Sequence, residues 1–235
     1  MPGLGLSYPS QRCRIETRLI CVVLNSQAEA MPDAKPTVVV IDDDPDLRGS
    51  VGRLLRSLGL DALLFGSVSD FLAAELPDGP ACLVLDVRLP GQSGLDFQRE
   101  FVATSRQLPI IFITGHGDIQ MSVQAMKGGA IEFLEKPFRD QELLDAIQLG
   151  LSRDRARREN DKALGALRER FEALTPRERE IMIHVVRGRL SKQIAFDIGV
   201  SEATVKVHRS NMMRKMKTAS LPELGLMADK LNLLY

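Results

Sequence analysis

The sequence has little cysteine and no long hydrophobic run, and both absences narrow what the chain can be. Its three cysteines, Cys13, Cys21 and Cys82, are an odd number with no C-x-x-C pair. Neither a disulfide framework nor a zinc site is indicated, which fits a reducing cytoplasm. The longest apolar run near the start, LICVVL, is far shorter than the roughly 20 residues of a membrane-spanning helix. We therefore expect a cytoplasmic protein without a membrane partner.

Residues 1–34 show no clear hydrophobic period and lead through MPDAKP into the first convincing strand. We expect this segment to be a disordered extension. Met31 is a second candidate for the first residue of the native protein.

The zero net charge hides an uneven distribution. Residues 31–150 contain 10 Lys/Arg and 18 Asp/Glu, whereas residues 151–235 contain 18 and 11. An acidic half is suited to a cation and a basic half to a polyanion. Two domains with different partners are the simplest interpretation.

Apolar strand patterns and amphipathic helix patterns alternate strictly through the acidic half. The expected strands are 37–41, 62–65, 82–86, 109–114 and 131–135, and the expected helices are 46–59, 68–76, 95–104, 119–129 and 140–151. This alternation predicts an α/β fold, a doubly wound five-stranded parallel sheet covered on both faces. Ligands of such sheets bind at the carboxyl ends of the strands.

Polar residues follow four of these strands: Asp42 and Asp43, then Asp86, Thr114 and Lys136. Three close carboxylates repel one another, and either a shared proton or a divalent cation with oxygen ligands, for which Mg²⁺ is suited, relieves that repulsion. A hydroxyl and an ammonium opposite them complete a phosphoryl-binding site, with Asp86 as its nucleophile. Taken singly, each residue has an ordinary alternative role as a helix cap, strand end or solvated charge. Four matched strand ends favour the joint site.

The segments VVVIDDDP, LVLDVRLPGQSG, FITGHGD and FLEKPF together resemble the receiver domain of bacterial two-component response regulators. The resemblance implies phosphotransfer from a sensor histidine kinase to Asp86. It also implies Mg²⁺ bound by Asp43, Asp86 and the backbone carbonyl of Arg88, with Asp42 assisting through water.

The same resemblance implies that Thr114 and Phe133 form the conformational switch, that Lys136 binds the phosphoryl group and that the bond before Pro137 is cis. Family members often have Tyr at the aromatic position, so Phe133 is a departure that leaves the details of the switch geometry open.

The basic half carries the pattern of a helix-turn-helix. Thr175, Pro176 and Glu178 form a capping box for a helix through Val186. A second helix is expected over 191–198, followed by Gly199 and a longer helix that begins after Ser201. The spacing of Ala195, Gly199 and Val205 is typical of a helix-turn-helix, whose second helix enters the major groove of DNA.

The long helix has one apolar and one basic face. Val205, Met212 and Met216 recur at core spacing, which a solvated surface helix would also show. The other face has no acid among its members, which favours DNA. Those members are Lys206, Val207, Arg209, Ser210, Arg214 and Lys217.

Residues 171–233 also resemble the LuxR-type, four-helix DNA-binding domain, an all-α fold, and residues 36–233 as a whole resemble the FixJ subfamily. This implies that Lys206, Val207 and Ser210 contact base edges beside Arg209, and that Lys192 and Thr204 contact phosphates. Many relatives carry a longer side chain where this chain has Ser210, so the base preference there is open.

We expect four segments: an extension (1–34), a receiver domain (35–150), a helical linker (151–170) and the DNA-binding domain (171–235). Leu164, Leu167, Phe171 and Leu174 form a short apolar seam in and after the linker. Such a seam can pair with a second copy or lie on a domain, and a loose tether is the alternative.

The sequence favours a phosphorylation-switched transcription factor that is not an enzyme. Its expected partners are a sensor histidine kinase, double-stranded promoter DNA, RNA polymerase and, on phosphorylation, a second copy. A Mg²⁺-dependent phosphohydrolase of the haloacid-dehalogenase type would carry D-x-D with its nucleophile after the first strand, whereas Asp86 follows the third. A DNA binder with a vestigial receiver is disfavoured because the residues of the strand ends are all present.

Overall fold

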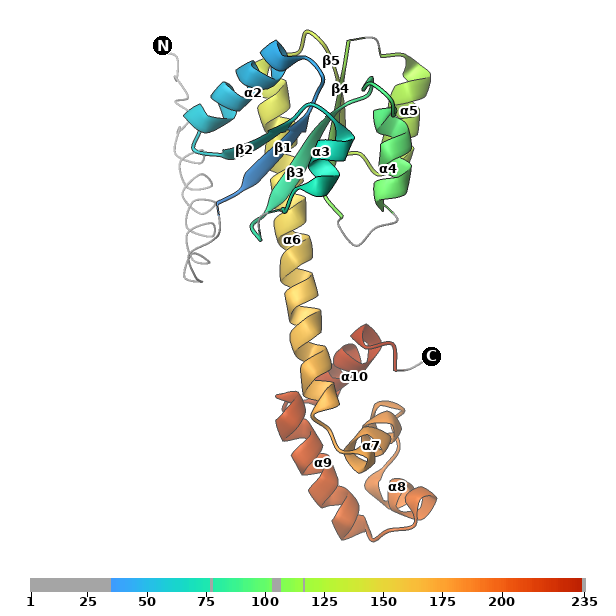
Figure 1. Ribbon diagram of the computed structural model, residues 1–235. Helices are drawn as coiled ribbons and strands as arrows, with labels where there is room; N and C mark the ends of the chain where they lie inside the picture. Colours follow the sequence, from blue (N-terminus) through green and yellow to red (C-terminus); the bar gives the residue numbers. More distant parts are fainter. Residues whose placement is uncertain (1–34, 77, 103–106, 116, 234–235) are drawn as a thin grey trace, which may run out of the picture.

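The structure, a computed structural model, describes residues 35–233 except 77, 103–106 and 116. The predicted extension over 1–34, with Cys13 and Cys21, lies outside the described residues. Two domains occupy opposite ends of one long helix (Figure 1).

The N-terminal domain is built on a parallel sheet with the strand order β2-β1-β3-β4-β5. The strands are β1 (Thr37–Ile41), β2 (Asp61–Phe65), β3 (Ala81–Asp86), β4 (Ile110–Thr114) and β5 (Glu132–Glu135). The near-continuous apolar sequences of β1, β3 and β4 suit strands covered on both faces, and these three strands are buried throughout. The chain places β2 on one side of β1 and then β3 on the other side, so the order in which strands are added reverses between β1 and β3. The carboxyl ends of these two strands flank the crevice where such sheets bind ligands.

Helices cover both faces of this sheet (Figure 1). One face packs on α2 (Pro45–Ser57) and the start of α6 (Asp140–Glu172), and the other packs on α3 (Val68–Ala73), α4 (Gly94–Val102) and α5 (Ile119–Lys127). Alternate strand residues serve the two cores: Val38 and Val84 face α2 and α6, while Val39 and Leu83 face the other layer. The predicted doubly wound fold is confirmed.

The prediction for the second helix was too long. α3 ends at Ala73 instead of Leu76, because Ala74 takes an extended conformation with φ −85° and ψ 149°. Leu76 then packs against the core from non-helical chain. A proline follows Leu76, and the residue before a proline disfavours helical geometry.

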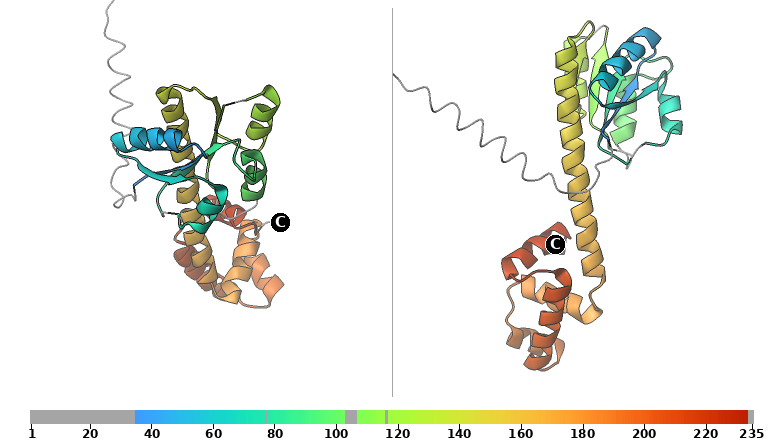
Figure 2. Two further views of the ribbon diagram at one scale, coloured as in Figure 1. Left: turned by 45° about the horizontal axis from the view of Figure 1, so that its top comes forward. Right: turned by 90° about the vertical axis from the view of Figure 1, so that its left-hand side faces the viewer.

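The long helix α6 continues without a break for 33 residues (Figure 2). Its first part belongs to the sheet domain, where Leu143, Ile147 and Leu151 are buried. Its last turns belong to the C-terminal domain, where Leu167 is buried. The predicted helix over 140–151 and the segment predicted as a linker are therefore one helix, and the structure shows no loose tether there.

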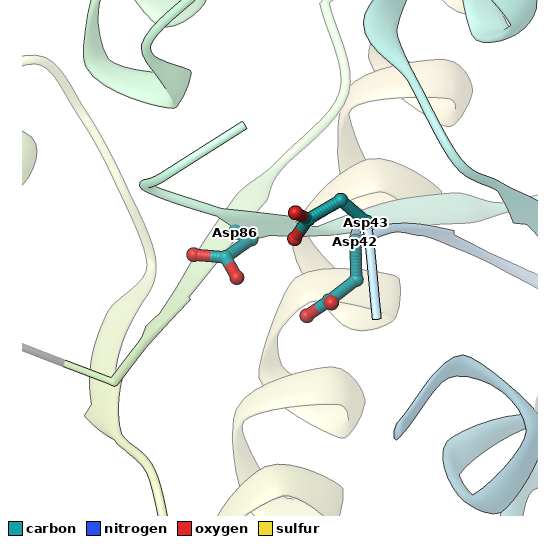
Figure 3. A group of neighbouring side chains, drawn as sticks. All are labelled: Asp42, Asp43 and Asp86. Atoms are coloured by element: carbon teal, nitrogen blue, oxygen red, sulfur yellow. The ribbon is translucent and has the colours of Figure 1, made fainter. Parts of the chain in front are cut away.

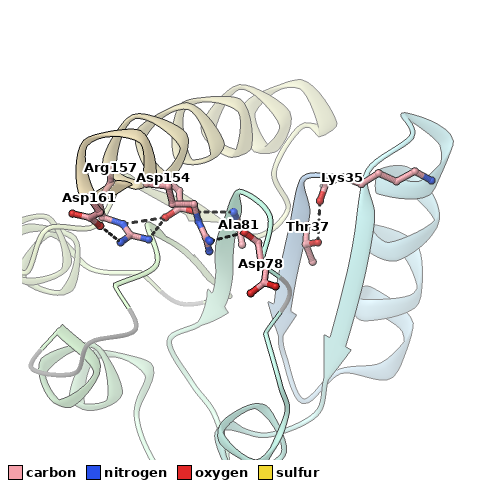
Figure 4. A network of polar contacts seen from close by, with 8 residues as sticks. Lys35, Thr37, Asp78, Ala81, Asp154, Arg157 and Asp161 are labelled. Carbon is pink, nitrogen blue, oxygen red and sulfur yellow. Dashed lines mark hydrogen bonds and ion pairs between the residues drawn. The ribbon is translucent and has the colours of Figure 1, made fainter. Parts of the chain in front are cut away.

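A buried ionic cluster fixes α6 where it leaves the sheet (Figure 4). Asp154 is fully buried and accepts a hydrogen bond of 2.9 Å from the backbone N–H of Ala81 at the start of β3. Arg157 and Arg158 each donate to its carboxylate at 2.6 Å, and Arg158 also donates to the carbonyl of Asp78. We call these three residues, Asp154, Arg157 and Arg158, the Asp154 clasp.

The C-terminal domain contains α7 (Pro176–Val186), α8 (Ser191–Ile198), α9 (Glu202–Met216) and α10 (Leu221–Lys230). Thr175 and Glu178 form the predicted capping box of α7. Gly199 ends α8 in the left-handed conformation with φ 68°, which only glycine adopts at no steric cost. The sequence also predicts a C-terminal helix from about Leu221 to Leu233, but α10 ends at Lys230 because Asn232 takes a left-handed φ of 54°.

The apolar seam packs on its own DNA-binding half. Leu167 and Leu174 are buried in the core of the C-terminal domain together with Val205, Met212 and Met216 of α9. Phe171 packs against the same core. The sequence left open whether the seam pairs with a second copy or lies on a domain. In the structure it lies on a domain, its own DNA-binding half.

Candidate functional site

Three carboxylates converge at the crevice between β1 and β3. Asp42 and Asp43 directly follow β1, Asp86 ends β3, and oxygen atoms of all three lie within 4.8 Å of one another (Figure 3). Asp42 and Asp86 are buried, whereas Asp43 is exposed. The residues predicted from the strand ends are thus brought together, with one carboxylate open to solvent.

Lys136 lies directly after β5 and joins two of these carboxylates. Its Nζ is 2.7 Å from Oδ2 of Asp42 and 2.6 Å from Oδ2 of Asp86. Burial acts to lower the pKa of Lys136, but the hydrogen bonds to the two carboxylates outweigh it, so its pKa lies above the ordinary value. Burial raises the pKa of Asp42, against the opposing hydrogen bond from Lys136. The ammonium partly neutralises the acid cluster.

Backbone groups fix the second oxygen of each buried acid. The N–H of Asp44 donates to Oδ1 of Asp42 at 2.8 Å, and the N–H of Arg88 donates to Oδ1 of Asp86 at 2.9 Å. Gly94 holds this loop close, because a Cβ at its position would lie 2.4 Å from the carbonyl oxygen of Asp86. The carboxylate of Asp86 is therefore oriented by a backbone donor on one side and by Lys136 on the other.

Thr114 and Phe133 lie at the neighbouring strands of the same edge. Thr114 ends β4 and is buried, and its carbonyl accepts a hydrogen bond of 2.7 Å from the N–H of Lys136. Phe133 is half-buried, and the centroid of its ring lies 6.4 Å from that of Phe112. A Cβ at Gly117 would lie 2.9 Å from the Phe133 ring and 3.1 Å from the methyl group of Thr114, so both predicted switch residues flank this glycine. The bond between Lys136 and Pro137 is cis, as the resemblance implied.

The donor set of the crevice fits a hard divalent cation. Carboxylate oxygens are the ligands that Mg²⁺ prefers, and an exposed acid beside buried ones leaves room for retained waters. Asp42, Asp43 and Asp86 form an acidic cluster compatible with such an ion. The backbone carbonyl of Arg88 as a further ligand stays a prediction.

The C-terminal domain presents a basic surface on α9 and α8. Lys206, Thr204 and Ser210 of α9 are exposed, and the side chain of Lys206 is 66% exposed. Val207 is 60% exposed although it is apolar. Lys192 on α8 is also exposed.

Three of the predicted DNA contacts have partners or cover in this structure, and one of them, Lys206, pairs with Glu202. Arg209 is half-buried, and the hydroxyl of Thr204 lies 2.8 Å from that of Ser201. The helix-turn-helix geometry therefore brings all six predicted residues to α8 and α9, while the contact that each makes with DNA stays a prediction.

Two stretches of the chain match known families. Residues 38–148 match the response regulator receiver domain, and residues 172–228 match the bacterial regulatory proteins of the luxR family. The chain is 50% identical over 199 residues to Nodulation protein W of Bradyrhizobium diazoefficiens, covering 85% of this chain and 88% of that relative. It is 43% identical to the transcriptional regulatory protein FixJ of Azorhizobium caulinodans, covering 84% of this chain and 93% of that relative. The chain belongs to the FixJ subfamily of two-component response regulators.

A solved structure agrees with this assignment. The low-resolution structure of the response regulator StyR superposes with a TM-score of 0.75 at 47% identity and covers 84% of this chain and 100% of the StyR chain. None of the helices in the described part of this response regulator is long and apolar enough to cross a membrane.

Sequence reasoning missed two charged residues of this response regulator. Glu202 in the first turn of α9 pairs with Lys206. The prediction from the sequence named the basic residues of this helix and did not include this acid. Asp154 anchors α6 to β3. Its signal was present in the sequence, since Asp154 continues the spacing of the buried stripe Leu143, Ile147 and Leu151 and has arginines three and four residues further on.

Proposed function

We propose that this response regulator accepts a phosphoryl group on Asp86 from a sensor histidine kinase and then binds promoter DNA as a dimer to regulate transcription. The observation that carries the proposal is the environment of Asp86. Its carboxylate ends a buried strand beside Lys136 and two further acids, at the one crevice that the strand order creates.

The chemistry follows from the two fixed sides of Asp86. A carboxylate oxygen attacks the phosphorus of the kinase phosphohistidine, a P–O bond forms, and the P–N bond breaks with its electron pair returning to the imidazole. Lys136 stabilises the negative charge of the incoming phosphoryl oxygens, and the hydroxyl of Thr114 donates a hydrogen bond to one of these oxygens. Asp43, Asp86 and the carbonyl of Arg88 would hold Mg²⁺, with Asp42 assisting through water. When bound, the ion neutralises charge between the acids and the phosphoryl group.

A docking surface for the kinase lies beside the crevice. A hollow of about 280 Å³ next to Lys136 is lined largely by apolar groups of α2 and of the loop that leads into α6, among them Leu47, Val51, Leu54 and Phe138. An apolar helix of the kinase would fit there and bring its phosphohistidine to Asp86. Because the kinase output and promoter DNA both lie in the cytoplasm, we place the protein there.

The dimer surface that we propose is the face of α5, β5 and α6. Ile119 is 82% exposed, and Val123, Met126 and Leu149 are also exposed on this face. Phosphoryl on Asp86 would draw Thr114 inward and let Phe133 follow, which reshapes the face next to Gly117. The dimer would then present two copies of α9 to DNA and recruit RNA polymerase. The seam at Leu167 and Leu174 contributes no dimer contact, since it is buried in its own domain.

A phosphohydrolase uses the same kind of acid cluster, but two observations favour the regulator. Asp86 ends the third strand of the chain rather than following the first, and residues 172–228 match a family of bacterial regulatory proteins. A DNA binder whose receiver no longer accepts phosphoryl is also disfavoured. The three acids lie together in the crevice, and Lys136 contacts Asp42.

Phosphorylation from a small donor such as acetyl phosphate tests the assignment of Asp86. The full chain should take up phosphoryl in Mg²⁺ and lose it slowly, as a regulator does, whereas Asp86→Asn should take up none because the nucleophile is gone. Asp70→Asn is a matched control, since Asp70 is an exposed acid on α3. Normal labelling of Asp86→Asn, or full labelling of the unchanged chain in excess EDTA, contradicts the proposal.

A further inference from the structure

The first turn of α9 carries an acid on an otherwise basic helix. Glu202 is the only acidic residue of α9. Its Oε1 lies 2.9 Å from Nζ of Lys206 one turn further on, and the two side chains are 45% and 66% exposed. Residues four apart share one face of a helix, so Glu202 and Lys206 point toward the same partner.

A second lysine also acts on the charge of Glu202. The hydrogen bond and charge of Lys206 lower the pKa of Glu202, and the charge of Lys192 on α8 adds to this effect. Glu202 is therefore a charged carboxylate that pairs with the lysine expected on bases and feels the charge of the lysine expected on phosphates.

The chemistry of DNA restricts what such a carboxylate can contact. Phosphates are negative and offer only acceptors, so they repel Glu202. Hydrogen-bond donors in the major groove belong to base edges, namely the amino groups of cytosine N4 and adenine N6. The N-terminal residues of a recognition helix are the ones that reach these edges, and Glu202 occupies that turn of α9.

We propose that Glu202 is a specificity-determining residue that accepts a hydrogen bond from the N4 amino group of a cytosine in the major groove. Lys206 would read a guanine of the same or the neighbouring base pair, so that the two side chains exchange their mutual contact for complementary base contacts. This inference rests on the proposed function, in which α9 reads promoter DNA.

Two other roles for Glu202 predict different effects of its removal on DNA binding. If Glu202 only neutralises Lys206, its removal raises affinity for every DNA sequence alike. If Glu202 only stabilises the first turn of α9 through the helix dipole, its removal lowers helix stability and changes affinity without changing the preferred sequence.

Binding-site selection from random DNA separates these roles. The full chain, with Mg²⁺ and beryllofluoride present, is compared with Glu202→Ala, Glu202→Gln and the control Glu180→Gln. Glu180 is paired with Arg177 on α7 and its side chain is 44% exposed, so the control removes the same charge from a similar ion pair. Circular dichroism checks that each variant keeps its helices.

We expect a cytosine in the wild-type motif that Glu202→Ala no longer selects, with affinity for the wild-type site reduced about tenfold and affinity for random duplex not reduced. Glu202→Gln should change the preference at that position from cytosine to adenine, because Gln pairs with the adenine edge. Glu180→Gln should select the wild-type motif.

The proposal is overturned if both Glu202 variants select the wild-type motif, whether their affinity rises uniformly, falls uniformly or stays unchanged. A wild-type chain that selects no motif overturns the reading of bases by α9 as well, and with it that part of the proposed function. The motif selected by the wild-type chain therefore distinguishes failure of the Glu202 inference from failure of the proposed function.

Discussion

At the scale of single residues, Lys192 and Lys206 carry the same charge but are predicted to contact different parts of DNA. Lys192→Ala should weaken binding to all sequences alike and reduce the slope of log K against log salt by about 0.9, because one phosphate contact is lost. Lys206→Ala should cost about 1 to 3 kcal/mol on the preferred site and little on random DNA. DNA titrations at several salt concentrations measure both effects, with Arg53→Ala as the control, because Arg53 is an exposed cation on α2, away from the dimer face and from α9. Equal weakening of specific and random DNA by Lys206→Ala would show that Lys206 contacts a phosphate.

Single residues of the phosphorylation crevice could be predicted because backbone topology alone brings them together. Asp42, Asp86 and Lys136 follow strands of one parallel sheet, so any such sheet places them at one edge. The pairing of Glu202 with Lys206 was not predicted, because it depends on the rotamers of two exposed side chains rather than on topology. The position of the predicted Arg88 carbonyl likewise depends on local loop geometry.

At the scale of elements, the Asp154 clasp is expected to stabilise the packing of α6 on the sheet. Burial acts to raise the pKa of Asp154, but the hydrogen bond from Ala81 and the two arginines outweigh it and lower the pKa below its ordinary value of 3.8. The ionised carboxylate therefore favours the folded state. Its contribution is complete above the pKa of the unfolded chain and is lost as the pH falls through the lower pKa of the folded chain.

Asp154→Asn should consequently lower the free energy of unfolding of the N-terminal domain by about 3 kcal/mol at pH 7, since it leaves two arginines without their buried partner. The difference from the unchanged chain should shrink as the pH falls below 3.8. Urea unfolding at several pH values measures it. Asp161→Asn is the control, because Asp161 is an exposed partner of Arg157. A difference that stays constant down to the lowest pH would show that ionisation of Asp154 is not the cause.

The elements themselves were largely predictable, and the exceptions have local causes. Period and capping signals located the five strands and the helix-turn-helix, including Gly199 and the Thr175 capping box. The ends of α3 and α10 differ from prediction because single residues, Ala74 and Asn232, leave helical geometry. The continuity of α6 was not fixed by composition, since it depends on anchoring at both ends by the Asp154 clasp and by Leu167.

At the scale of the whole molecule, two mechanisms could couple phosphorylation to DNA binding: dimerisation, or release of a DNA-binding domain that is masked by its own receiver. The position of α9 favours dimerisation. The figures show α8 and α9 at the end of the molecule farthest from the sheet domain (Figures 1 and 2). Lys206 and Val207 of α9 are exposed there, and neither is covered by the sheet domain. Two copies joined through the receiver face would gain DNA affinity by effective concentration, on half-sites about one helical turn apart.

The mass of the full chain in solution tests the central claim, that phosphorylation of Asp86 assembles the DNA-reading form, most directly. Sedimentation is measured with and without beryllofluoride and Mg²⁺, which together mimic the phosphoryl group, and DNA affinity is titrated on the same samples. We predict a monomer without the mimic and a dimer of higher DNA affinity with it, while Asp86→Asn stays monomeric in both conditions. A chain that remains monomeric while its DNA affinity rises would contradict the account.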